Sequence, residues 1–187
     1  MSNFKKFAAV SAFLFLSFGV CAVASAQAVT AGQTEALALV GGVTDGGGLA
    51  LGGGMHYAFN PRWLFDGELA YLTGGNDVQR SIRGFGVNIE NNAVSVDLNA
   101  HYLFPQSTNQ KVMPYLLGGL GFLRVSASAT VLGMTTSVSD TAVGLNVGAG
   151  ARWQAGRRWG VLPEMKVFVA DNSSVRFSTG LYYQFGR

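Results

Sequence analysis

Residues 92–104 read NAVSVDLNAHYLF, and this stretch decides the fold class. Its apolar residues Val94, Val96 and Leu98 alternate with polar ones. A period of two is the pattern of a β-strand with one apolar and one polar face. The stretch also exceeds the roughly 10 residues with which a tilted strand crosses a bilayer. The pattern therefore predicts a strand that separates an apolar environment from a polar one.

The same alternation runs through most of the chain. In residues 48–59, for example, Leu49, Leu51 and Met55 share one face, whereas His56 lies on the other. Residues that favour turns, such as Gly, Pro and Asn, separate the alternating stretches. We predict eight strands, at residues 35–43, 48–59, 63–74, 92–104, 112–126, 140–153, 159–171 and 175–185.

The first residues carry the features of an export signal. Lys5 and Lys6 precede an apolar run, which ends in the small residues Ala24, Ser25 and Ala26. A basic start, a short apolar run and small residues at the cleavage site are typical of a secretory signal peptide. We therefore predict a cleavable signal peptide at residues 1–26 and a single domain at residues 27–187.

Acylation of Cys21 is the alternative fate of this N-terminal segment. The residues before that cysteine, Phe18, Gly19 and Val20, fit a lipidation site poorly. Cleavage after Ala26 would remove the cysteine, and the chain contains no other. The exported domain must therefore be stable without a disulfide.

Composition narrows the fold further. Only 12 % of the residues are charged, about half the share in an average soluble domain. After residue 26 no run of 18 residues is continuously apolar, so we predict no transmembrane helix. A hydrophobic exported chain without such helices crosses a bilayer only as a closed barrel, because every backbone polar group needs a partner. We predict an all-β fold, a transmembrane antiparallel up-and-down β-barrel; a soluble β-sandwich is disfavoured because the apolar strand faces carry no charge.

The connections between the predicted strands are of two kinds. Residues 60–62, 105–111 and 154–158 form short turns, whereas residues 75–91 and 127–139 form longer loops. In an up-and-down barrel these short turns all lie at one end. Short periplasmic turns opposite longer outer loops are typical of bacterial outer-membrane barrels, so we predict localisation in a Gram-negative outer membrane.

Aromatic residues gather next to the predicted short turns. Residues 56–59 and 101–104 both read His-Tyr-X-Phe, and a turn containing proline follows each. Amphipathic rings prefer the headgroup level of a bilayer. We predict an aromatic girdle formed by Tyr57, Phe59, Trp63, Tyr102, Phe104, Tyr115, Trp153, Trp159, Tyr183 and Phe185.

Ionisable residues of the strands fall mostly on the face opposite the apolar one. A base on the lipid side at mid-bilayer would cost about 2–4 kcal/mol, and an unpaired charge inside the barrel would also be destabilising. We therefore predict a lumen plugged by ion pairs; an open pore is the alternative. The predicted lumen network comprises His56, Asp66, Glu68, Asp97, His101, Arg124, Arg152, Glu164, Lys166 and Arg176.

One lumen pair follows from the turn at residues 60–62. If that turn closes a tight hairpin, His56 lies opposite Asp66. The favoured interpretation is a hydrogen-bonded pair without metal, and the other is half of a metal site completed by His101. We predict no catalytic site, no metal and no cofactor.

The chain resembles the small outer-membrane barrels of the OmpA, OmpX and opacity-protein type. The most specific likeness is Pro114-Tyr115 followed by a glycine-rich run to Gly121. The terminal strand at residues 175–185 is similar to the C-terminal signal that the outer-membrane assembly machinery recognises. The resemblance implies that machinery, lipid and lipopolysaccharide as partners. It also implies a role in envelope integrity, adhesion or immune evasion, or a small channel.

We therefore expect a non-enzymatic barrel that acts in envelope structure or through its outer loops. A narrow channel is the alternative. A lipid A-modifying enzyme is less favoured, because both histidines should point inward near the periplasmic end. The nearly balanced charge beyond residue 26 does not favour nucleic-acid binding. The contact candidates on the longest predicted loop are Asp77, Arg80, Arg83 and Glu90.

Overall fold

The computed structural model describes most of the chain after the predicted signal peptide. Within strands, the side chains of residues 87–91, 129–131 and 134–135 are not described. The prediction of a signal peptide at residues 1–26 lies outside the described residues. No described residue belongs to a helix long and apolar enough to span a membrane. The described residues are 29–44, 48–73, 87–104, 111–131, 134–171 and 173–185.

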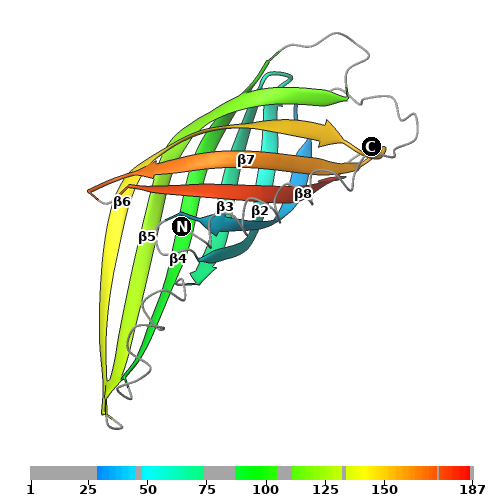
Figure 1. The fold of residues 1–187 in the computed structure, drawn as a ribbon. Helices are drawn as coiled ribbons and strands as arrows, with labels where there is room; N and C mark the ends of the chain where they lie inside the picture. The colour runs from blue at the N-terminus through cyan, green and yellow to red at the C-terminus, as the bar shows by residue number, and fades with distance from the viewer. Residues whose placement is uncertain are drawn as a thin grey trace.

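Eight antiparallel strands close into a barrel (Figure 1). Each strand pairs with the next, and the last strand pairs with the first. The predicted fold class, an all-β antiparallel up-and-down barrel, is therefore confirmed. The strands are β1 (Thr34–Val43), β2 (Leu49–Asn60), β3 (Trp63–Thr73), β4 (Val87–Leu103), β5 (Val112–Val131), β6 (Met134–Gln154), β7 (Trp159–Val169) and β8 (Ser174–Phe185).

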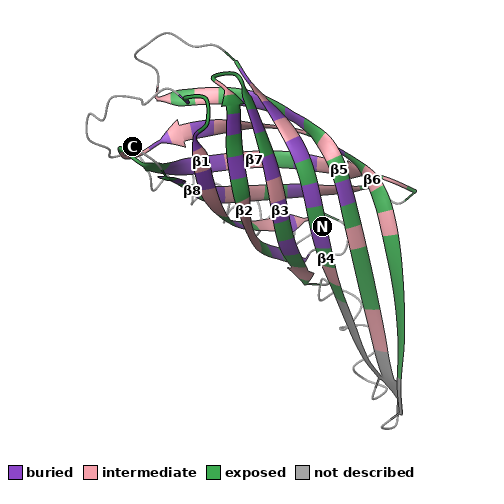
Figure 2. Ribbon diagram, turned by 180° about the vertical axis from the view of Figure 1, so that it is seen from behind, coloured by how far each residue is buried: buried purple, intermediate pink, exposed green. Residues whose placement is uncertain are grey.

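The barrel is apolar outside and polar inside. On β4 the side chains of Val94, Val96 and Leu98 are 41–55 % exposed, whereas Asp97 and Asn99 between and beside them are buried. The alternation of buried and exposed residues along the strands is visible in Figure 2. Leucine and valine on a continuous outer surface are stable only against an apolar solvent, so the outer surface fits the hydrocarbon of a bilayer.

One end of the barrel, here called the turn end, carries the β2–β3 and β6–β7 turns and the first and last described residues. The Asn60 side chain closes the β2–β3 turn by accepting hydrogen bonds from the backbone of Arg62 and Trp63 at 2.8 and 3.0 Å. Before β1, Gly32 adopts a φ of 80°, a conformation that glycine tolerates best. Inside this end an apolar cluster includes Val29, Ala58, Leu64, Leu103, Tyr115, Leu117, Leu162 and Tyr182.

At the opposite end, here called the hairpin end, β4, β5 and β6 extend beyond the other strands (Figure 1). β5 and β6 pair continuously up to Val131 and Met134, so the prediction of a loop at residues 127–139 is wrong. The prediction for residues 75–91 also needs correction, because β4 begins at Val87. Residues 127–139 are rich in Ser, Thr and Val, of which Thr and Val favour strands. The two faces of this segment are too alike in polarity to show a clear alternation.

Candidate functional site

The deepest ionic group inside the barrel centres on Glu35, which is fully buried near the turn end. Arg152 from the facing strand β6 donates two hydrogen bonds of 2.7 Å, one to each carboxylate oxygen of Glu35. His56 and Gln184 lie at 3.2 Å from the same carboxylate. The guanidinium of Arg152 also stacks 4.0 Å above the ring of Tyr182. This arrangement joins β1, β2, β6 and β8 across the lumen.

Next to this group lies a cluster of His56, Asp66 and His101, all buried. The register of β2 and β3 places His56 directly opposite Asp66, as predicted. However, the hydrogen-bonding contact of the His56 Nδ1 atom is with Glu35 and not with Asp66. His101 approaches Asp66 from the other side, with 3.5 Å between Nε2 and Oδ1. The His101 ring stacks on Tyr115 with 4.9 Å between centroids.

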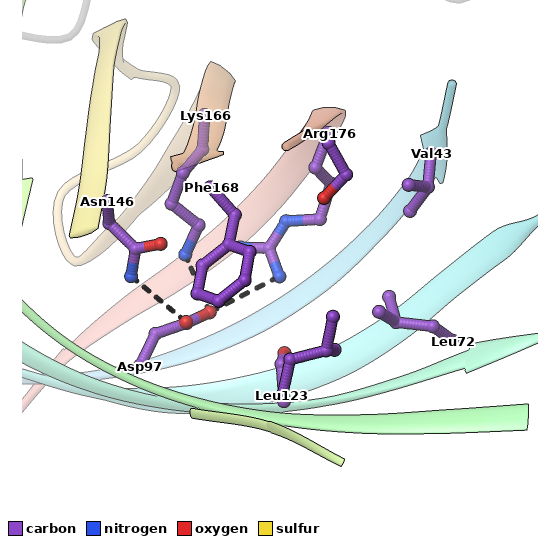
Figure 3. Close-up of a pocket in the computed structure, with 10 residues that line it drawn as sticks. Val43, Leu72, Asp97, Leu123, Asn146, Lys166, Phe168 and Arg176 are labelled. Carbon is purple, nitrogen blue, oxygen red and sulfur yellow. Dashed lines mark hydrogen bonds and ion pairs between the residues drawn. The ribbon is translucent and has the colours of Figure 1, made fainter. Parts of the chain in front are cut away.

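A second ionic group lies closer to the hairpin end and contains two acids and two bases. The ammonium of Lys166 is 3.3 Å from Glu68 and 2.9 Å from Asp97. Arg176 pairs with Glu68, and its other terminal nitrogen is 3.6 Å from Asp97. Asn146 donates to Asp97 at 3.0 Å. Figure 3 shows the side chains of Asn146, Lys166 and Arg176 converging on Asp97.

Above the second ionic group a small pocket of about 40 Å³ opens to solvent towards the hairpin end. Its floor is ionic, because Asp97, Lys166 and Arg176 line it. Its wall is more apolar: Figure 3 shows Phe168 beside the ionic floor, with Leu72 and Leu123 nearby. A cavity of this size holds a few water molecules, and the charges of its floor already have partners.

Arg124 does not belong to the lumen network, so that prediction is wrong. It is exposed on the outer face of β5, on the same side as Leu116, Leu120 and Phe122. The outward positions from Val112 to Phe122 span about 25 Å along the barrel axis, at about 3.3 Å per residue and a tilt of about 40°. Arg124 follows at the edge of this apolar band, where the cost of an outward base is small.

Tyr115 is not part of the aromatic girdle, and this prediction is also wrong. Its side chain is 1 % exposed and points into the lumen, where its hydroxyl donates to Glu164 at 2.9 Å. Burial of the ring is stable because the apolar cluster surrounds it and the hydroxyl has a partner.

The other predicted girdle residues lie on the outer face near the turn end. Their rings contact one another: Trp63 meets Tyr102 edge to face at 5.1 Å, and Tyr183 meets Phe185 at 5.3 Å. These outer aromatic residues are Tyr57, Phe59, Trp63, Tyr102, Phe104, Trp153, Trp159, Tyr183 and Phe185.

The outer-loop candidates could be placed only in part. Asp77, Arg80 and Arg83 lie outside the described residues. Glu90 lies in β4, paired with Ser128 of β5, so its assignment to a loop is wrong. This end of the barrel therefore includes paired strands where a loop was predicted.

Sequence reasoning missed Glu35, the most buried carboxylate of the interior. Both faces of the segment around it are apolar, so alternation alone does not show which side faces inward. With Glu35 inside and Arg124 outside, the four acids and four bases of the predicted lumen network become five acids and three bases. Among the described strand side chains, the interior acids are Glu35, Asp66, Glu68, Asp97 and Glu164, and the interior bases are Arg152, Lys166 and Arg176.

Comparison with solved structures shows the same fold in several bacterial outer-membrane proteins. The N-terminal barrel domain of OprF from Pseudomonas aeruginosa is 14 % identical, with a TM-score of 0.58, and 84 % of this chain aligns with all of it. Ail of Yersinia pestis is 19 % identical over 83 % of this chain and all of its own, with a TM-score of 0.57. A major outer membrane protein from Thermus thermophilus gives a TM-score of 0.64 at 14 % identity, over 82 % of this chain and 98 % of its own.

No curated protein matched the sequence. The family model for the outer membrane protein beta-barrel domain matches residues 12–185, which is most of the chain. The eight strands of this chain, their order in the sheet and the apolar outer face of the barrel agree with that match. The chain therefore belongs to the outer membrane protein beta-barrel domain family and is located in the outer membrane.

Proposed function

We propose that this protein is a non-enzymatic barrel with a closed lumen that acts in envelope structure or in surface contacts at its hairpin end. The observation that carries the proposal is the pair of ionic groups that crosses the interior. The first group joins Glu35 to Arg152. The second joins the acids Glu68 and Asp97 to the bases Lys166 and Arg176.

Closure follows from the size of the barrel and from the contacts inside it. The interior of an eight-stranded barrel is only just wide enough for its own side chains. An ion that crossed this one would have to separate buried ion pairs, which leaves charges without partners at a cost of several kcal/mol. It would then meet the apolar cluster at the turn end. A continuous water-filled path is therefore not expected.

The surface role rests on the β5–β6 extension, defined as residues 125–131 and 134–141. Its seven residues on β5 reach about 23 Å along the strand beyond Arg124, at about 3.3 Å per residue. β7 pairs with β6 only from Leu145 onwards, so the described part of β6 before it has a free edge. A free strand edge can pair with an extended segment of another protein, which makes this extension a suitable contact surface.

The proposed partners at the membrane are lipid and lipopolysaccharide. Arg124 lies at the edge of the apolar band, where its charge suits a lipopolysaccharide phosphate. The terminal strand β8 ends at Phe185 and closes the barrel against β1, which suits the proposed contact with the assembly machinery.

The arrangement of the two histidines supports a non-enzymatic role. A lipid-hydrolysing site needs a histidine beside a nucleophile such as serine near the outer lipid leaflet. Both histidines of the chain are buried in the lumen close to the turn end. Ser95 is also buried inside the barrel, on the same face as Asp97, and therefore has no access to lipid.

Conductance of the refolded protein in a planar bilayer tests lumen closure. As a first step, a difference in gel mobility between the unboiled and the boiled sample would establish that the barrel is folded. We expect no discrete openings from the folded protein. Steady single-channel openings would contradict closure and favour the narrow channel.

A second experiment tests the proposed surface role of the hairpin end. An epitope tag inserted between residues 132 and 133 should be detected by antibody on intact cells that export the protein. A tag inserted after Gly156, at the turn end, is the matched control and should react only after the outer membrane is opened. Labelling of the control alone would place the hairpin end on the inner side and exclude the surface role.

A further inference from the structure

We propose that His56, Asp66 and His101 form a binding site for one zinc ion inside the barrel. Each residue offers one ligand atom, and the three atoms lie within 4.8 Å of one another. They come from three neighbouring strands, β2, β3 and β4, with Asp66 on the middle one. Two imidazole nitrogens, one carboxylate oxygen and a water molecule form a common zinc coordination set.

The three ligand atoms have no hydrogen-bond partner of ordinary length. Nε2 of His56, Oδ1 of Asp66 and Nε2 of His101 are all buried without one, and the last two form only the 3.5 Å ion pair with each other. A buried polar atom without a partner costs about 1–3 kcal/mol, so three such atoms facing one another call for a common partner. The hydrogen-bonded pair favoured from the sequence does not satisfy them, because His56 is bonded through its other nitrogen.

The spacing suits a small ion after a modest closure. Zinc–nitrogen bonds of about 2.0–2.1 Å place tetrahedral ligand atoms about 3.3 Å apart. The distance between Nε2 of His101 and Oδ1 of Asp66 is already 3.5 Å. The widest pair must close by roughly 1.5 Å, which a rotation of an imidazole ring or carboxylate about its side-chain bonds can supply.

The surroundings hold His56 in the form that binds metal. Its Nδ1 lies 3.2 Å from Glu35, so a proton on that nitrogen is held by the carboxylate and Nε2 keeps its lone pair for a metal. Histidines that bind zinc usually make this kind of second contact to a carboxylate. Glu35 is itself fixed by the two hydrogen bonds from Arg152, which prevents it from turning towards the ion.

The charge inside the barrel also suits a divalent cation. Five acids and three bases point inward on the described strand side chains. Both bases near the hairpin end are engaged by Glu68 and Asp97, and Arg152 is engaged by Glu35. The remaining excess of two negative charges equals the charge of one zinc ion. Protonation of both histidines would supply the same charge without metal, and the experiment must separate these two cases.

Zinc binding to the refolded barrel, measured by competition with a chromogenic chelator, tests the proposal. The metal-free protein in detergent micelles is refolded with or without Zn²⁺, because the site is buried and loading can require an unfolded chain. We expect one zinc per folded barrel. Asp66→Asn and His101→Asn should each weaken binding at least tenfold, whereas the control Asp140→Asn, at an exposed position of β6 outside the lumen, should bind as the unaltered protein does.

Cobalt provides a second readout that does not depend on whether the variants fold. Co²⁺ bound by two imidazoles and a carboxylate in a near-tetrahedral site gives strong visible absorption, and excess Zn²⁺ should remove it. Failure of the folded, unaltered barrel to bind zinc under both refolding conditions would overturn the proposal and leave protonated histidines as the counter-charges. Equal binding by the Asp66 and His101 variants and the unaltered barrel would overturn it as well.

Discussion

Replacement of Arg152 by methionine should destabilise the barrel far more than the loss of an exposed charge does. Methionine keeps much of the side-chain volume but removes the guanidinium. Glu35 then loses two hydrogen bonds of 2.7 Å, and Tyr182 loses the cation stacked on its ring. The Glu35 carboxylate is fully buried, so water cannot replace the lost partner.

The size of the effect follows from what remains around Glu35. Removing one partner of a buried ion pair costs about 3–5 kcal/mol, because an uncompensated charge is left behind. The side chains of Gln33, His56 and Gln184 stay within 3.2–3.4 Å of Glu35 and keep the loss within that range. Removing both charges together with Glu35→Gln and Arg152→Met should restore at least half of the loss, since no buried charge then lacks a partner.

Equilibrium unfolding by urea in detergent micelles or lipid vesicles measures these free energies. Tryptophan fluorescence and the gel shift on boiling should report the same transition. Arg157→Met, at an exposed position in the β6–β7 turn, is the control and should leave the midpoint unchanged. If Arg152→Met lowers the free energy of unfolding by less than about 1 kcal/mol, the value typical of an exposed ion pair, the interpretation that water cannot reach the Glu35–Arg152 pair is wrong. A double variant that is no more stable than Arg152→Met alone would also contradict it.

Three further changes test other parts of the structure. A methyl group at Gly119 would collide with the backbone oxygen of Leu98, so Gly119→Ala should cost about 1–3 kcal/mol in urea unfolding; Gly118→Ala, where the nearest atom is 3.8 Å away, should cost almost nothing. Tyr115→Phe removes the hydrogen bond to Glu164 and should lower the unfolding free energy by about 1 kcal/mol; an unchanged midpoint would show that this bond adds nothing. Arg124→Gln should reduce the lipopolysaccharide retained in native mass spectrometry without moving the unfolding midpoint, and full retention would exclude Arg124 as a phosphate contact.

The sequence predicts the barrel well because the outward residues of most strands are large and apolar. Strands β2, β3 and β8 begin and end within one residue of the expected positions. The two-residue turn between β2 and β3 fixes the register, so the pairing of His56 with Asp66 was predictable as well. In these segments the local pattern and the requirement for an apolar outer surface agree.

The errors come from segments in which both faces are apolar. Around β5, Leu116 and Leu117 are adjacent, so alternation does not reveal which of them faces the lipid. The structure buries Leu117 and exposes Leu116, which places Tyr115 inside and Arg124 outside. The same ambiguity in β1 hid Glu35.

The partners that meet across the lumen, rather than on neighbouring strands, could not be predicted from the sequence. Glu35 and Arg152 are separated by 117 positions in the chain, and they meet across the lumen rather than along a hairpin. Which residues meet in this way depends on the stagger of the closed barrel, and no local pattern encodes it.

The seam between β1 and β8 makes closure of the barrel depend on two distant parts of the chain. Thr34 pairs with Phe185 at one end of this seam and Val43 with Arg176 at the other, so it joins nearly the first and last described residues. Contacts between such distant parts of a chain form slowly. Until they form, the sheet has two open edges and Gln184 cannot reach Glu35. A chain that lacks β8 cannot form this seam, so it would keep two unpaired strand edges, which are sites of aggregation.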